Sequence, residues 1–108
     1  MTLDSYAAAV SGLDPDPGEV ETAELVVTDD VLVKAFVLGP GAAVDPHEHA
    51  DATNVFHVTE GEPTVIRDGD EEALAAPAVV ENPRGAVHGA RNDTDDRAVL
   101  TASIAPLN

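Results

Sequence analysis

The pair His47 and His49 is the first feature of this sequence that indicates chemistry. In an extended segment, residues two positions apart point to the same face. Pro46 restricts the backbone immediately before His47. Two imidazoles on one face can serve as two ligands of a single divalent metal ion. A His-x-His pair is a short motif, so two solvated side chains in a polar loop are the alternative interpretation.

The two other histidines, His57 and His88, have different surroundings. His57 lies three positions after Asn54 in one expected strand, and alternation therefore places these two side chains on opposite faces. If Asn54 faces the interior, His57 faces outward and is not expected to be a metal ligand. His88 follows a turn-rich segment that contains Pro83 and Gly85, and its spacing alone assigns it no partner.

Strands must position these side chains. After residue 19 the sequence consists of short runs rich in Val, Leu, Ile and Thr, separated by Gly, Pro and Asp. Asp68-Gly69 is a strong signal for a tight hairpin. The expected strands cover residues 23–28, 31–38, 54–59, 64–67, 71–75, 79–80, 86–91 and 98–104. Short strands separated by turns every ~8–12 residues predict an all-β sandwich or barrel.

The first residues read differently. Thr2 or Ser5 is expected to cap a short helix from Tyr6 to Val10, with Gly12 as its stop signal. A turn-rich linker follows at 14–18. A chain of 108 residues suits one compact domain. We therefore expect an N-terminal helix and linker over 1–19 and a β-barrel domain over 20–108.

Two sequence motifs surround the histidines. The first contains Gly41, His47, His49, Asn54 and Gly61. The second contains Pro83, Gly85, His88 and Asn92, with Pro77 at its start. In this order and at this separation, over residues 41–92, they make the chain resemble the small single-domain proteins of the cupin superfamily. Glu is usual where Asn54 stands, and Gly is usual where Pro77 stands.

The resemblance implies a jelly-roll β-barrel that holds one divalent transition metal ion: iron, zinc, manganese, nickel or copper. His47, His49 and His88 match three of the family's ligand positions. Asn54 occupies the fourth, but its neutral amide oxygen is a weaker donor than a carboxylate. Three neutral imidazoles are still a competent site, and an empty, degenerate pocket is the alternative. Asn92 is expected to close a turn with Asp93.

The function implied by the resemblance is that of a small metal-binding cupin acting on an unidentified small molecule. Oxygenase and isomerase chemistry are both common in the superfamily. The alternative is a non-catalytic small-molecule or metal-binding module. The resemblance also implies a homodimer.

The composition of the chain limits the classes of partner that it is expected to bind. The chain has 21 acidic and 5 basic residues, a net charge of −16, so nucleic acid and anionic membranes are not expected to bind it. Scattered carboxylates and a single lysine are typical of a halophilic, salt-rich cytoplasm. The sequence contains no cysteine, which excludes disulfides and thiolate metal ligands. No apolar run reaches the ~20 residues of a membrane span, and no signal-peptide pattern is present, so the expected location is the cytoplasm.

Overall fold

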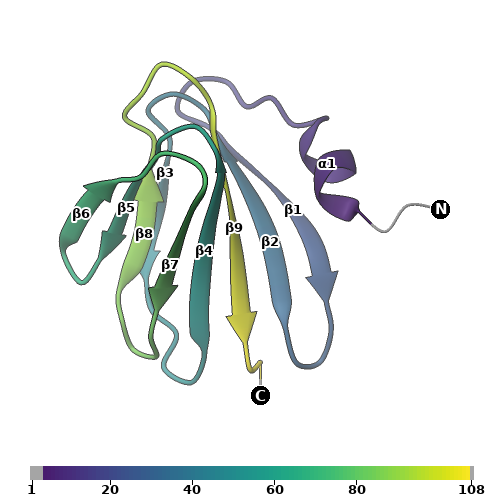
Figure 1. Cartoon of the computed structure of the whole chain (residues 1–108), viewed down its shortest axis with the longest axis vertical. Helices are drawn as coiled ribbons and strands as arrows, with labels where there is room; N and C mark the ends of the chain where they lie inside the picture. Colours follow the sequence, from purple (N-terminus) through teal and green to yellow (C-terminus); the bar gives the residue numbers. More distant parts are fainter. Residues whose placement is uncertain (1–3, 108) are drawn as a thin grey trace.

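The computed structural model describes residues 4–107, which form one short helix and nine strands (Figure 1). The elements, in chain order, are α1 (Ser5–Val10), β1 (Val20–Val27), β2 (Leu32–Leu38), β3 (Ala43–His47), β4 (Thr53–Glu60), β5 (Thr64–Arg67), β6 (Asp70–Ala73), β7 (Ala78–Asn82), β8 (His88–Arg91) and β9 (Ala98–Ala105). The fold is therefore all-β with a short N-terminal helix, as the sequence predicts.

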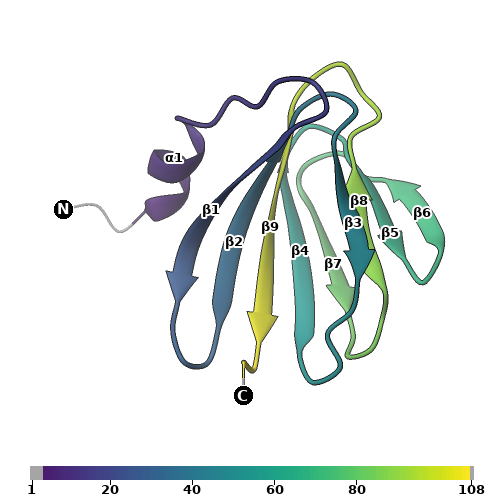
Figure 2. The same ribbon diagram turned by 180° about the vertical axis from the view of Figure 1, so that it is seen from behind.

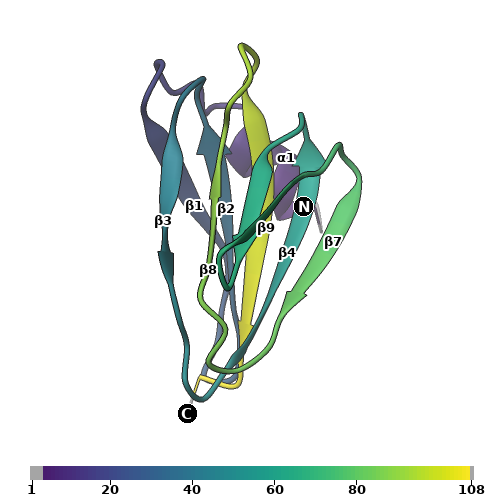
Figure 3. The same ribbon diagram turned by 90° about the vertical axis from the view of Figure 1, so that its left-hand side faces the viewer.

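The strands form two antiparallel sheets (Figures 1 and 2). One has five strands in the order β1-β2-β9-β4-β7, and the other has four in the order β3-β8-β5-β6. Seen side on in Figure 3, the sheets face each other and approach toward the lower end of the view. This end is where β3 finishes and β8 begins. The result is the conical jelly-roll barrel implied by the two motifs.

The main core lies between the sheets. Alternate residues of β4 point inward, so that Phe56 and Val58 are 2% and 0% exposed while His57 between them is exposed. Leu100 and Ala102 of β9 pack against them from the neighbouring strand. Phe56 is the largest fully buried side chain within the described residues, in a sequence with one Tyr, two Phe and no Trp.

Helix α1 covers the outer face of the five-stranded sheet. Val10 is 3% exposed and packs with Val37 and Val99 in a second apolar cluster. The N-cap is Asp4, whose side chain accepts a hydrogen bond from Tyr6 N, so the expected cap at Ser5 is wrong; Thr2 lies outside the described residues. Within residues 4–107 no helix has the length and apolar character needed to cross a bilayer.

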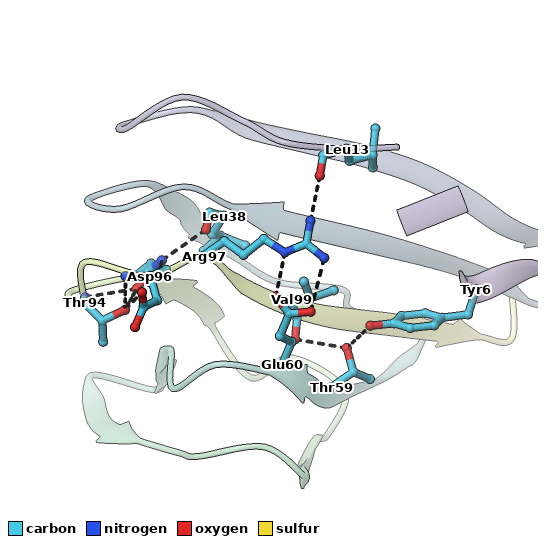
Figure 4. A network of polar contacts seen from close by, with 10 residues as sticks. Tyr6, Leu13, Leu38, Thr59, Glu60, Thr94, Asp96, Arg97 and Val99 are labelled. Carbon is cyan, nitrogen blue, oxygen red and sulfur yellow. Dashed lines mark hydrogen bonds and ion pairs between the residues drawn. The ribbon is translucent and has the colours of Figure 1, made fainter. Parts of the chain in front are cut away.

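Arg97 ties the linker after α1 to the barrel (Figure 4). Its guanidinium donates to both carboxylate oxygens of Glu60, at 2.6 and 3.2 Å, and to Leu13 O at 2.7 Å. Beside it, the hydroxyl of Tyr6 meets that of Thr59, which in turn donates to a β9 carbonyl. These contacts fix the helix and linker on the sheet at several points.

The main difference from the predicted strands is β3. Its histidine pair is expected in an extended segment, but no strand is predicted there from the sequence. β3 is short, and a bulge interrupts its pairing with β8 between Val44 and His47. Four of its five residues are exposed, so it carries no apolar alternation that would reveal it. The hairpin at Asp68-Gly69 is confirmed, with both residues at positive φ.

Candidate metal centre

Three histidines meet at the narrow end of the barrel. His47 ends β3, His49 follows two residues later, and His88 begins β8. Their ring centroids are 5.1 Å apart for His47 and His49, 4.6 Å for His47 and His88, and 5.4 Å for His49 and His88. One ring nitrogen from each lies within 4.8 Å of the other two. The expected pairing of His47 with His49 on one face is therefore confirmed, and His88 joins them.

The backbone pairing of β3 and β8 brings His47 and His88 together. These two residues are direct partners across the strands, so their side chains share a face. Gly89 permits the close approach, because a Cβ atom there would lie 2.7 Å from Val44 O and 3.0 Å from Pro46 N. A larger residue at position 89 would push β3 away and separate the two imidazoles.

A turn positions His49, which lies beyond the end of β3. Gly85 N donates a hydrogen bond of 2.9 Å to His49 O, which ties the loop after β3 to the loop before β8. Gly85 has a φ of 81°, a conformation that favours glycine. The glycine of the second motif thus acts on a histidine of the first.

Two backbone carbonyls orient the imidazoles. His47 Nδ1 lies 3.0 Å from Asp45 O, and His88 Nδ1 lies 3.0 Å from Ala86 O. A carbonyl oxygen only accepts, so each Nδ1 carries the proton and each Nε2 keeps its lone pair. This arrangement is typical of metal-binding histidines, whose second nitrogen donates to a carbonyl or carboxylate.

Two of the other imidazole nitrogens are buried without a protein partner. His49 Nε2 and His88 Nε2 are buried and make no hydrogen bond. A buried polar atom left unpaired costs about 1–3 kcal/mol, and native proteins seldom tolerate it without a reason. A divalent metal ion would satisfy both atoms at once. The donor set of three imidazoles suits zinc, iron, copper or nickel, so these residues fit such an ion.

Burial favours the neutral form of two of the imidazoles by lowering their pKa. It is the main cause that lowers the pKa of His49, and a positive charge on His47 would lower it further. Burial likewise lowers the pKa of His88, against the opposing effect of its hydrogen bond to Ala86 O. A neutral imidazole has the free lone pair that metal binding needs. Exposure rises from buried His88 through half-buried His49 to exposed His47, so the cluster opens toward solvent at His47.

Asn54, the fourth residue of the expected ligand set, faces the barrel interior. It is 1% exposed and lies on the same face of β4 as Phe56, whose ring is 5.5 Å from that of His88. Its Oδ1 accepts a hydrogen bond of 3.0 Å from Asn82 Nδ2. Asn82 is not among the site residues predicted from the sequence. Because it stands directly before Pro83, it resembles an ordinary turn residue, and only the pairing of β4 with β7 places it beside Asn54.

The other polar residues singled out in the sequence lie away from the cluster. His57 is exposed on the outer face of β4, as alternation predicts. Asn92 does close a turn, but its partner is Thr94: Asn92 Oδ1 accepts from Thr94 N at 3.0 Å. Asp93 is the middle residue of this turn, as expected.

An open cleft of about 350 Å³ reaches the cluster at His49. Glu48 and Asp51 contribute negative charge to its wall, and Ala52, Ile104 and other apolar residues complete it. This charge attracts cations and repels anions. Of the three histidines only His49 lines the cleft, and the acidic wall beside it favours a small molecule without negative charge.

Comparison with known proteins agrees with this architecture. The family model described as Cupin domain matches residues 35–104. No protein among the curated sequences matches significantly. Among solved structures, a Thermus thermophilus protein is 30% identical with a TM-score of 0.78, over 84% of this chain and 87% of that one.

Two further solved structures are similar. A Klebsiella pneumoniae protein described as having a double-stranded beta-helix domain is 26% identical, with a TM-score of 0.80, over 89% of this chain and 84% of that one. A predicted oxalate decarboxylase from Thermotoga maritima is 25% identical, with a TM-score of 0.78, over 83% of each chain. With two facing antiparallel sheets, a histidine cluster between them and a family match over most of the barrel, the chain belongs to the cupin domain family.

Proposed function

We propose that this chain binds one divalent transition metal ion through His47, His49 and His88, and that a small molecule binds at the positions of the ion left open by these residues. The observation that carries the proposal is the pair of buried, unpartnered nitrogens, His49 Nε2 and His88 Nε2. Cupins commonly bind a divalent metal, which agrees with this interpretation.

The protein's own residues prepare the site in three ways. Asp45 O and Ala86 O hold the protons of two imidazoles at Nδ1, so that Nε2 faces the site. Burial lowers the pKa of His88 and so favours its neutral form. The edge contact of Phe56 with His88 places an apolar wall behind the imidazole and excludes water there. A bound metal ion would supply Lewis-acid or redox chemistry at this position.

We further propose that the chain catalyses oxygenase-type or isomerase-type chemistry on a small molecule. The similar structures include a predicted oxalate decarboxylase and, at 25% identity, a recombinant oxalate oxidase in complex with glycolate. The second candidate is a metal-binding module without turnover. Asn54 favours that candidate, because no carboxylate stands at this position to balance the charge of the ion or to accept a proton.

Metal content tests the proposal. The protein is purified in molar salt without a histidine tag, reconstituted with each candidate ion and assayed by elemental mass spectrometry. We expect about one equivalent per chain, lost in His47→Ala. His57→Ala is the matched control, since this histidine faces outward and its replacement should leave the metal in place. Failure to retain any of the ions would contradict the proposal, and loss in both variants would show that the histidines act through folding.

Three further expectations stay predictions. The homodimer is tested by sedimentation in high salt, where a species of 11.1 kDa would contradict it. Adaptation to a salt-rich cytoplasm is tested by thermal unfolding in low and molar potassium chloride, where we expect stability to rise with salt. The division into a helix and linker over 1–19 and a barrel over 20–108 is tested by expressing the second part alone.

A further inference from the structure

Two buried amides lie beside the histidine cluster. Asn54 of β4 and Asn82 of β7 are 1% and 0% exposed, and they are direct partners across the two strands. Asn82 Nδ2 donates to Asn54 Oδ1 at 3.0 Å, a bond between side chains inside the barrel. Each amide therefore uses only one of its two polar atoms in this contact.

The other two polar atoms of the pair have no partner. Asn82 Oδ1 is buried without a hydrogen bond, and among the described residues none accepts from Asn54 Nδ2. An asparagine can accept two hydrogen bonds and donate two, so the pair is strongly under-satisfied. Structural amides are normally satisfied by the protein itself, and each exception calls for a specific explanation.

The free atoms are complementary whichever way the amides are turned. As described, the pair offers a free donor at Asn54 Nδ2 and a free acceptor at Asn82 Oδ1. Rotating both amides by half a turn exchanges the two residues' roles and leaves, again, one donor and one acceptor. Rotating only one would place two oxygens or two NH₂ groups against each other. The pair thus always presents one donor and one acceptor, without charge.

Neither amide lines the cleft itself, but Asn54 neighbours two residues that do. Asn54 has Ala52 two residues before it and Ile104 directly opposite it on β9, and both line the cleft that reaches His49. In the other direction along β4, Phe56 contacts the His88 ring. Along β4, Asn54 therefore stands between a residue of the cleft wall and a residue that contacts His88.

We infer that Asn54 and Asn82 recognise an uncharged hydroxyl or carboxamide group on the small molecule that binds at the metal centre. Either group can donate to the free oxygen and accept from the free NH₂. A carboxylate has no proton to donate and would set its lone pairs against Asn82 Oδ1. Glu48 and Asp51 on the cleft wall also disfavour an anion. This inference rests on the proposed metal centre for the ligand's position and goes beyond it in the ligand's chemistry.

The first test compares acetamide with acetate, which have the same shape and differ in charge, and neither of which has a hydroxyl group. Binding of each to the cobalt-loaded protein is followed by the visible spectrum of the ion. Because the metal itself prefers a carboxylate, the informative quantity is the ratio of the two dissociation constants. We expect this ratio to shift about tenfold toward acetate when both amides are replaced in Asn54→Leu with Asn82→Leu. In the control His57→Ala the ratio should not change.

An unchanged ratio in the double variant, or no acetamide binding to the native protein, would overturn the inference. Loss of cobalt from the double variant would also overturn it, because Asn54 would then be a ligand of the ion. Elemental analysis of the same samples separates these outcomes from a failure of the proposed function, in which the native protein itself holds no metal.

The second test needs no metal. Leu has the same number and branching of side-chain heavy atoms as Asn, so replacing both amides removes an under-satisfied pair with little change of shape. We expect the melting temperature of the metal-free double variant to stay the same or rise. Asn92→Leu, which removes a satisfied buried amide, should lower it by roughly 4–8 °C or more.

A double Asn54→Ala and Asn82→Ala variant, which cannot overpack the barrel, is measured alongside. If both double variants lose as much stability as Asn92→Leu, the pair is structural and the inference is wrong.

Discussion

The two ends of β8 treat a buried polar side chain in opposite ways. His88 begins the strand and is 1% exposed, while Asn92 directly follows it and is 0% exposed. His88 Nε2 has no hydrogen-bond partner. Asn92 Nδ2 donates to three carbonyls, those of Leu38, Gly39 and Asp96, and its Oδ1 accepts from the backbone and hydroxyl of Thr94. The two side chains are equally buried, but only Asn92 has hydrogen-bond partners for both of its polar atoms.

This difference separates a structural residue from a binding residue. Asn92 finds all of its hydrogen-bond partners within the protein. Its bonds tie the end of β2 to the segment that precedes β9. The histidine end leaves buried nitrogens unpaired, each at a cost of about 1–3 kcal/mol, in a domain class whose whole stability is about 5–15 kcal/mol. We call the His88 end of β8 the incomplete end and the Asn92 end the complete end. We interpret the incomplete end as arranged for a ligand, and the complete end as the part that keeps the barrel folded around it.

Replacing His88 gives the largest expected effect. His88→Ala removes the most buried of the three imidazoles, and metal affinity should fall by more than the roughly 100-fold that loss of an outer hydrogen-bond partner can cost. Titration of the metal-free protein with zinc measures this affinity. The barrel should still fold with a similar melting temperature, because the variant also removes an unsatisfied nitrogen. A variant that binds zinc as tightly as the native protein would place the ion elsewhere.

A substitution of Asn92 should lower the stability of the protein and leave its metal binding unchanged. Asn92→Asp keeps the shape but replaces the NH₂ group, which donates to three carbonyls, with an oxygen that repels them. We expect a loss of about 2–4 kcal/mol in the free energy of unfolding, measured with urea. Metal content per folded chain should be unchanged. If metal is lost at full stability instead, the two ends are not independent and the comparison fails.

Asn54→Glu is expected to strengthen metal binding at the incomplete end. A carboxylate at this inward-facing position adds a charged donor beside the imidazoles, and Asn82 Nδ2 can still donate to it. Divalent metal should bind about tenfold more tightly than in the native protein. Val55→Glu, on the neighbouring and more exposed position of the same strand, is the control and should bind metal as the native protein does. Equal affinity in Asn54→Glu and native protein would mean that residue 54 does not reach the ion.

Sequence reasoning recovered the parts of the molecule that depend on local pattern. The strand Thr64–Arg67 has its predicted bounds, and strict alternation along β4 places His57 outside and Asn54 inside. The positions of the three clustered histidines follow from the motifs. These features need only the period of a strand and the conformational demands of turns.

Other parts depend on how distant strands pair, which the local pattern does not contain. β3 is exposed and bulged, so its strand state follows from its pairing with β8. Asn82 acquires its role from standing opposite Asn54, 28 positions earlier in the chain. Gly89 belongs to no part of either motif, yet its missing side chain lets β3 approach. In each case register across strands, and not composition, supplies the missing information.

The smallest expected effect is a pH dependence at the complete end, where Arg97 binds Glu60. The hydrogen bond from Arg97 is the main cause that lowers the pKa of Glu60 below its ordinary value of 4.5. A lowered carboxyl pKa stabilises the folded protein above pH 4.5, and this contribution is lost as the pH falls through the lower pKa of the folded state. Because the Glu60 side chain is 45% exposed, the contribution should be less than about 1 kcal/mol. Urea unfolding of native protein and Glu60→Gln should therefore differ near neutral pH and converge in acid, whereas Glu62→Gln, at an exposed neighbour, should follow the native curve. A constant difference between native protein and Glu60→Gln at all pH values would mean that Glu60 acts through packing and not through its charge.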